Sequence, residues 1–297
     1  MTATRTHTRI ALAVAGVAAL GLTACSGGGG GDEASGNTLE KIQDEGTVTL
    51  AIAEERPYSW VGDDGEPTGA TIAMHEQIFS GLGVDNIEVQ EVDWNSLIPG
   101  LNAGRFDAIS AGMSILPERC EQAAFSDPEI MYTTALTVPA GNPEGLETLD
   151  DVLAKDGDVT LAVQSGAIEE GYAQDLGISN TITVDDTQSG IEAVQSGRAD
   201  AFALTGVSLN WMTEGMDDVE ATEPYVQVID GVEQIGAGAT VFRQDDTELL
   251  EAYNEQLANI TSDEQSYLDL VEDFGFTAEN LPPADLTTEQ LCSGDLG

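Results

Sequence analysis

One arginine in the first half of the chain is placed where it could bind a carboxylate. Arg119 follows an apolar stretch, residues 106–112, that predicts a strand, and Pro117 marks a turn between the two. A guanidinium presents a rigid fork of N–H donors that matches a carboxylate bidentately. Because the whole chain has only nine Lys and Arg residues, a cation at a strand end is unusual here. The alternative is a surface arginine paired with one of the many acids.

Catalytic chemistry finds little support in the sequence. Glu55 and Glu118 could each act as a general acid, but no carboxylate pair and no Ser/Cys–His arrangement accompanies them. The two histidines, His7 and His75, cannot form a metal cluster. We therefore expect a protein that is not an enzyme, with no catalytic residues, metal or cofactor.

The elements that must position Arg119 are alternating strands and helices. Strands are predicted at 47–53 and 87–92 in addition to 106–112, and helices at 69–82 and 94–103. This alternation predicts a parallel sheet with helices on both faces. Such sheets bind ligands at the carboxyl ends of their strands, which is where Arg119 follows.

The second half of the chain repeats this organisation. The run from Gly104 to Ala108 (G-R-F-D-A) is echoed by Gly197 to Ala201 (G-R-A-D-A), which indicates two similarly built lobes. The pattern also predicts further elements, which are strands at 131–139, 159–163, 181–184 and 237–243 and helices at 39–45, 168–176, 189–197, 246–260 and 262–274.

The charge balance limits the partners. Without Arg5 and Arg9, which belong to the N-terminal segment described below, seven basic residues face 54 acids, a net charge near −47. This argues against nucleic acid and anionic membrane surfaces as partners. The acids are scattered, so we interpret them as a solvated acidic surface adapted to a salty exterior.

The N-terminus reads as a secretory signal. Arg5 and Arg9 precede an apolar run, residues 10–22, that is too short for a permanent transmembrane helix. Leu22-Thr23-Ala24-Cys25 resembles a bacterial lipobox, in which Cys25 is lipidated, and the glycines at 27–31 would form a tether. We predict a signal peptide at 1–24, a lipidated cysteine and tether at 25–38, and an extracytoplasmic protein anchored to the outer face of the cell membrane. The alternative is an ordinary signal cleaved near Ala24.

Two further cysteines, Cys120 and Cys292, remain after this segment. An isolated pair outside the cytoplasm can form a disulfide, and we predict one. Two unpaired buried thiols are the alternative.

The stretch around Arg119 resembles a known family. A strand ending in Gly112, then Ser114-x-x-Pro117-x-Arg119, then F-S-x-P at 125–128, is similar to the family 3 solute-binding proteins that deliver polar amino acids and related compounds to ABC importers. The resemblance covers about residues 39–292. It is strongest to the ectoine/hydroxyectoine-binding branch, through the runs 97–101, 117–120, 141–143 and 188–190 and the late Cys292.

The resemblance implies an α/β fold. This is the two-lobed periplasmic-binding-protein fold of type II, in which each lobe is a mixed, mostly parallel sheet flanked by helices and two hinge strands join the lobes. Lobe 1 would comprise 39–137 and 238–297, and lobe 2 would comprise 138–237. The implied partners are a small ligand and the permease and ATPase subunits of the importer, with the binding protein itself a monomer.

Three departures from the amino-acid-binding pattern of the family concern the ligand. Glu55 stands where relatives place a stacking aromatic, three residues before Tyr58. Thr205 stands where they place an Asp that pairs with the α-ammonium group, and Ala167 with Ile168 replaces a carboxylate-binding Thr after Gln-Ser165-Gly. These changes imply that the site for the α-amino group is lost, whereas the carboxylate clamp Arg119 remains.

The resemblance then implies a role for each site residue. Arg119 would bind the ligand carboxylate, and Glu55 would pair with the delocalised amidinium of a cyclic zwitterion such as ectoine. Trp94, Tyr58 and Trp60 would flank the ring by cation–π attraction, worth about 0.5–2 kcal/mol each. The ligand-binding set is completed by backbone and small side chains at Gly112, Ser114, Ser165, Ala167, Ile168 and Thr205.

Other interpretations stay open at this point. Each of the three aromatics could simply pack in the core, and the branch's second aromatic falls at Ser114, so the aromatic cage would be built differently here. The ligand could be a polar amino acid whose ammonium pairs with Glu55. A periplasmic enzyme or a sensor on the same fold is a further alternative.

Overall fold

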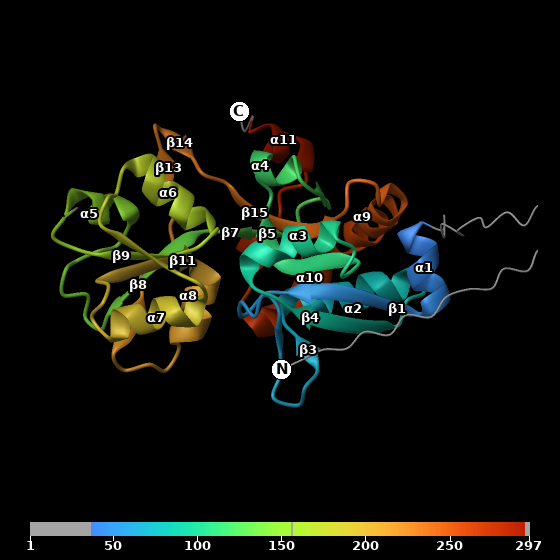
Figure 1. Ribbon diagram of the computed structural model, residues 1–297, viewed down its shortest axis with the longest axis horizontal. Coiled ribbons are helices and arrows are strands. Elements are labelled where there is room, and N and C mark those ends of the chain that lie inside the picture. The colour runs from blue at the N-terminus through green and yellow to red at the C-terminus, as the bar shows by residue number, and fades with distance from the viewer. Residues whose placement is uncertain (1–36, 156, 295–297) are drawn as a thin grey trace, which may run out of the picture. The chain divides into compact units, whose positions relative to one another are not determined.

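The computed structural model describes residues 37–155 and 157–294. The predicted signal peptide, Cys25 and nearly all of the tether lie outside the described residues. The described chain forms two lobes, each built on its own β-sheet (Figure 1). No helix among the described residues has the length and apolar character needed to span a bilayer.

The first sheet is mixed. Its strands β1 and β4, and β1 and β5, are parallel, whereas β15 runs antiparallel to β5, β6 and β7. The strand order is β4 (Asn86–Glu91), β1 (Thr47–Ile52), β5 (Ala108–Ser114), β15 (Gly236–Phe242) and β6 (Ala124–Phe125), with β7 (Ile130–Tyr132) also on β15.

The second sheet repeats this plan. Strand β9 is parallel to β10 and β11, and β8 is antiparallel to β11 and β12. The order is β10 (Thr181–Val184), β9 (Leu161–Gln164), β11 (Ala201–Thr205), β8 (Thr134–Pro139) and β12 (Val219–Ala221). The two predicted lobes therefore have similar sheets, and each contains one strand, β15 in the first and β8 in the second, that is antiparallel to its neighbours.

Two hairpins and the helices complete the lobes. The hairpins are β2 (Trp60–Val61) with β3 (Pro67–Thr68) and β13 (Val228–Ile229) with β14 (Val232–Glu233). The helices of the first lobe are α1 (Thr38–Glu45), α2 (Ala70–Gly81), η1 (Trp94–Ser96), α3 (Leu97–Asn102), α4 (Pro117–Cys120), α9 (Thr247–Thr261), α10 (Glu264–Val271), η2 (Glu272–Phe274), η3 (Ala278–Asn280) and α11 (Thr288–Ser293). Those of the second lobe are α5 (Leu149–Ala154), α6 (Ile168–Leu176), α7 (Thr187–Gln195) and α8 (Gly206–Thr213).

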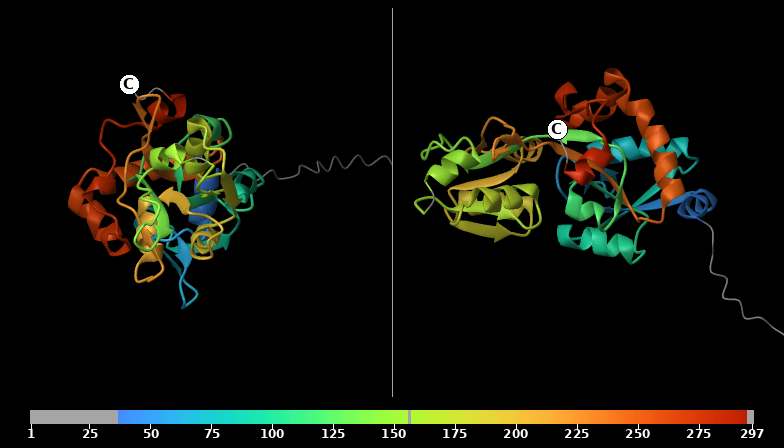
Figure 2. Two further views of the ribbon diagram at one scale, coloured as in Figure 1. Left: turned by 90° about the vertical axis from the view of Figure 1, so that its left-hand side faces the viewer. Right: turned by 90° about the horizontal axis from the view of Figure 1, so that it is seen from above.

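Two segments connect the lobes, and they run together (Figure 2). The chain leaves the first sheet after β7 and enters the second at β8, so the crossing is at Thr133. This is a few residues before the boundary predicted at 137/138, because the predicted single strand 131–139 is two strands in different sheets. The returning segment pairs with the outgoing one, since Thr134 and Tyr225 exchange backbone hydrogen bonds of 2.9 and 2.8 Å.

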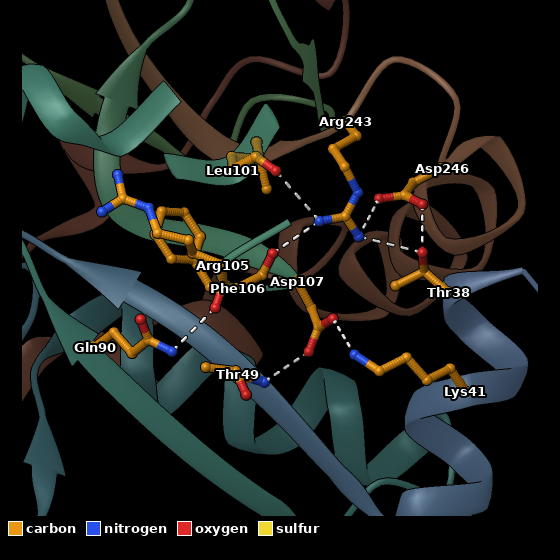
Figure 3. Close-up of polar contacts among 10 residues, drawn as sticks. All are labelled: Thr38, Lys41, Thr49, Gln90, Leu101, Arg105, Phe106, Asp107, Arg243 and Asp246. Carbon is orange, nitrogen blue, oxygen red and sulfur yellow. Dashed lines mark hydrogen bonds and ion pairs between the residues drawn. The ribbon is translucent and has the colours of Figure 1, made fainter. Parts of the chain in front are cut away.

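The repeated G-R-x-D-A run has the same structural role in both lobes. Asp107 accepts a hydrogen bond from the backbone N–H of Thr49 (3.0 Å), and Asp200 accepts one from the backbone N–H of Thr160 (2.7 Å). Figure 3 shows the first of these carboxylates, which also receives Lys41 Nζ at 2.9 Å. In each repeat the Asp ties its strand to the start of the neighbouring strand, which explains the sequence echo.

The C-terminal helix α11 is tied to helix α4. Cys120 and Cys292 form a disulfide, with their Cα atoms 5.7 Å apart. Arg119 precedes Cys120 on α4, so the cross-link fixes the short helix that carries the predicted carboxylate clamp.

Candidate ligand-binding site

A small cavity lies between the two lobes, at the carboxyl ends of β1, β5, β9 and β11. Its volume is about 20 Å³, close to the space that one water molecule occupies. The lobes are therefore closed, and a ligand larger than water enters only when they move apart. The lining residues come from both lobes and are Glu55, Tyr58, Trp94, Ala111, Gly112, Ser114, Tyr132, Gln164, Ala167, Ile168, Glu169, Leu204 and Thr205.

Glu55 is the lining acid of the first lobe. Its side chain is 7% exposed and accepts a hydrogen bond from Ser208 Oγ at 2.8 Å, with Thr205 Oγ1 at 3.5 Å. Burial raises the pKa of Glu55 to about 7, although the two hydroxyl donors oppose the shift. Both donors belong to the second lobe, so lobe closure brings neutral hydroxyls, not a cation, to this carboxylate. A cationic group of a ligand would offset the buried charge.

Arg119 lies beside the cavity rather than in its lining. Its Nη1 donates to Ser114 O (3.0 Å) and its Nη2 to Gly166 O (2.7 Å), and its guanidinium carbon is 5.7 Å from the centre of the Trp94 ring. These two bonds use two of the five N–H donors of a guanidinium. Burial lowers the pKa of Arg119, but an arginine stays charged in proteins. The cation therefore spans the two lobes and keeps donors for an anion.

Three aromatic rings border the cavity. Tyr58 packs over Gly112, whose φ of +55° and lack of a side chain make this approach possible: a Cβ there would lie 2.5 Å from Tyr58 Cδ1. Tyr132 meets Tyr58 edge-on with ring centroids 6.3 Å apart, and its hydroxyl donates to Ser114 Oγ. Trp94 is the third ring. Tyr132 thus brings an aromatic beside Ser114, the position at which the sequence lacks one.

Trp60 differs from its predicted role. It is not part of the cavity lining, because hairpin β2–β3 carries it away from the cavity. Its ring packs against Trp211 at 6.0 Å and Phe274 at 5.9 Å, and Arg56 lies 5.3 Å from its centre. Trp60 therefore contacts the second lobe at another place.

The turn after β9 is the part of the second lobe that meets Arg119 and Trp94. Trp94 Nε1 donates to Gly166 O at 3.2 Å, the same carbonyl that Arg119 binds. Asn95 Nδ2 donates to Ser165 Oγ at 3.0 Å. The predicted residues at 167 and 168 line the cavity, whereas Ser165 makes this interlobe contact outside the lining.

The sequence pattern did not single out several lining residues, of which Tyr132 and Glu169 have the most chemical consequence. Glu169 is 1% exposed, at the start of α6, and Thr134 Oγ1 donates to its Oε1 at 3.2 Å. Neither was recognisable from local patterns: Tyr132 reads as a core strand residue and Glu169 as an acid of the first turn of a helix. Among the described residues no group of His, Cys, Asp or Glu is arranged to hold a metal ion.

Two curated proteins and one solved structure illustrate what this chain is similar to. A probable amino-acid ABC transporter periplasmic-binding protein, y4tE of Sinorhizobium fredii, is 35% identical over 262 residues, 86% of each chain. The arginine-binding extracellular protein ArtP of Bacillus subtilis is 25% identical, over 90% of this chain and 97% of its own. The crystal structure of EhuB in complex with hydroxyectoine superposes with a TM-score of 0.75 and 32% identity, over 86% of this chain and 97% of EhuB.

The present structure shares the two-lobed type II periplasmic-binding-protein fold with the EhuB structure, so the predicted fold is confirmed. A family model also matches residues 48–274, which include both sheets almost completely. The cavity between two similar lobes, the relatives and this match lead to one conclusion: the chain belongs to the bacterial extracellular solute-binding proteins, family 3.

Proposed function

We propose that this protein is the ligand-capturing component of an ABC importer and that its ligand is ectoine or hydroxyectoine, held by closure of the two lobes. One observation carries the proposal: Glu55 lines an interlobe cavity bordered by aromatic rings, and Arg119 of the same lobe lies beside that cavity, against the ring of Trp94. The likeness to EhuB, a protein solved with hydroxyectoine, supports it.

Each group would meet a complementary part of the ligand. The remaining donors of Arg119 would bind the carboxylate of the zwitterion. Glu55 would pair with the delocalised cation, replacing the hydrogen bonds that Ser208 and Thr205 now donate. The rings of Tyr58, Tyr132 and Trp94 would enclose the ligand and exclude water from the ion pairs.

Lobe closure would be the capture step. The hydrogen bonds of Trp94 and Arg119 to Gly166 and of Asn95 to Ser165 join the lobes directly. Bending at the two connecting segments, near Thr133 and between β12 and β15, would separate them and open the cavity. We place the lobe boundaries in these two segments.

The importer's other subunits would be a permease and an ATPase. The closed, ligand-loaded form would deliver its ligand to the permease. The lipobox-like run ending at Cys25 would anchor the protein to the outer face of the cell membrane.

A free α-amino acid is the second candidate ligand. The relatives named as amino-acid or arginine-binding proteins favour it. The neutral Thr205, which faces Glu55 where an α-ammonium partner would be needed, favours ectoine.

Isothermal titration calorimetry of the purified mature protein would test the assignment. The ligands would be ectoine, hydroxyectoine, proline, glycine betaine, L-glutamine and L-arginine. We expect ectoine or hydroxyectoine to bind with a Kd of about 1 μM or tighter, about −8 kcal/mol, and the others at least about 100-fold more weakly. Tighter binding of an amino acid than of both ectoines would refute the assignment.

A further inference from the structure

Glu169 is a buried acid that the proposed ligand contacts do not use. It lines the same cavity as Glu55 and comes from the opposite lobe. One oxygen, Oε1, accepts from Thr134 at 3.2 Å, whereas Oε2 has no hydrogen-bond partner among the described residues. A carboxylate oxygen buried without a partner costs free energy, so its presence at a ligand cavity points to a ligand or a proton.

The charges around the cavity do not balance. Arg119 supplies one positive charge, and Glu55 and Glu169 supply two negative charges if both are ionised. A zwitterion such as ectoine adds no net charge, so the closed cavity would keep one uncompensated negative charge. Burying such a charge is costly, and a group in that position takes up a proton instead.

The hydrogen bonds decide which acid takes the proton. Glu55 accepts from Ser208 at 2.8 Å and lies 3.5 Å from Thr205 Oγ1, and both contacts favour its ionised form. Glu169 accepts from its own backbone N–H and from one side-chain hydroxyl, that of Thr134, at the longer distance of 3.2 Å. Its free Oε2 can carry a proton without breaking a bond.

The surroundings of Glu169 agree with this choice. Burial raises its pKa to about 7 and Glu55 adds to the rise, whereas its own backbone N–H, Thr134 and Arg119 oppose it. The titratable and charged groups that face it from the packed elements are Glu55, Arg119, Tyr58, Tyr132, Tyr172 and Tyr225. The tyrosines remain neutral near pH 7, since burial raises their pKa values further.

We propose that Glu169 is a ligand-facing carboxyl of the second lobe that takes up one proton from solvent when the lobes close over a zwitterion of zero net charge. The proton binds Oε2, which then donates a hydrogen bond to the ligand. This inference rests on the proposed site for a small zwitterion but not on the identity of that zwitterion. Uptake of this proton would couple ligand capture to pH.

The sign of the pH dependence follows from the shift. Burial, together with Glu55 of the first lobe, raises the pKa of this carboxyl in the closed form; opening the lobes would withdraw Glu55 and admit water, so protons favour the bound state. The contribution of Glu169 to affinity is therefore largest below about pH 4.5, falls by up to tenfold per pH unit between about pH 4.5 and 7, and levels off above pH 7.

The test compares the parent with Glu169→Gln, in which an uncharged amide replaces the protonated carboxyl. Asp175→Asn is the control, because it removes one acid from the exposed side of the same helix. Calorimetry with ectoine at pH 5.5 and 8.5, in buffers of different ionisation enthalpy, measures both affinity and proton uptake. At pH 5.5 we expect uptake approaching one proton in the parent and the control, falling toward zero at pH 8.5, and none at either pH in Glu169→Gln. At pH 8.5 Glu169→Gln should bind about tenfold more tightly than the parent.

Two results separate this inference from the identity of the ligand. If ectoine does not bind but L-glutamine or proline binds with the same Glu169-dependent uptake, the ectoine proposal fails and the inference stands. If L-arginine, which carries an extra positive charge, is the preferred ligand, binds without proton uptake and is weakened by Glu169→Gln, the inference is overturned. Unchanged uptake in Glu169→Gln also overturns it.

The protein alone gives a further readout should none of these compounds bind. Lobe closure buries Glu169, so the radius of gyration from small-angle X-ray scattering should fall between pH 8.5 and 6 in the parent and in Asp175→Asn. It should change much less in Glu169→Gln. Identical pH responses in all three would overturn the role of Glu169.

Discussion

Replacing Glu55 by Gln tests the charge at the centre of the proposed site. The carboxylate is 7% exposed, and its partners are hydroxyls of Ser208 and Thr205. An amide has nearly the same size and can still accept from Ser208. The substitution therefore removes the counter-charge for a ligand cation and changes little else.

The expected loss follows from this environment. Removing one partner of a buried ion pair costs about 3–5 kcal/mol, because the other charge is left uncompensated. We expect the lower end, about 3 kcal/mol or roughly 100-fold in Kd, because the amide oxygen still accepts a hydrogen bond. The stability of the protein without ligand should not fall, since the buried carboxylate is itself costly, with a pKa raised to about 7.

The assay is calorimetric titration with ectoine at pH 7, with urea denaturation to establish that the variant is folded. Glu76→Gln is the matched control, because Glu76 lies on an exposed position of α2 in the same lobe. It should bind as the parent does. If Glu55→Gln also binds ectoine with the parent's affinity, the interpretation of Glu55 as the partner of a delocalised cation is wrong.

Three further predictions concern the clamp, the cross-link and a buried histidine. Arg119→Lys should weaken ectoine binding tenfold or more, because a point charge replaces the fork that reaches both lobes. The control Arg105→Lys, at an exposed position, should not weaken binding. If calorimetry gives Arg119→Lys the same affinity as the parent, Arg119 is not part of the site. Replacing Cys120 and Cys292 by Ser should lower the free energy of unfolding, measured in urea, by at most about 4–5 kcal/mol, because the cross-link spans 172 positions. If a thiol reagent labels both cysteines in the unfolded, unreduced parent protein, the disulfide is contradicted. Burial lowers the pKa of His75 to about 3, so the unfolded chain binds the extra proton below pH 6.5 and stability should fall toward pH 4, by up to about 1.4 kcal/mol per pH unit. Urea titrations at pH 4.5 and 7 should show a smaller difference in the free energy of unfolding for His75→Gln than for the parent. The same difference in both proteins would contradict this role of His75.

Local patterns were sufficient for most of the framework. The helix predicted at 168–176 and the strand at 181–184 have those bounds in the structure, because caps and periodicity are local properties. The strand predicted at 106–112 is instead Ala108–Ser114, because pairing with β15 extends it to Ser114. The run 131–139 is divided between two sheets, which no local pattern distinguishes from one long strand.

The sequence by itself determined the two-lobed plan, through the G-R-x-D-A echo, and the chemical types at the cavity. Glu55, Tyr58, Trp94 and Thr205 were all predicted there through the resemblance to the family, and they meet because they follow or end strands whose carboxyl ends lie at the cavity.

Only the tertiary structure decided which other residues reach the cavity. Trp60 lies on a hairpin outside the cavity lining, whereas Tyr132, at the end of β7, and Glu169, in α6 of the second lobe, line the cavity. Their roles depend on how closely the lobes approach, as do the contacts of Glu55 and Arg119 across the interface. The physical reason is that burial and charge balance belong to the closed pair of lobes, and no local run of residues encodes either.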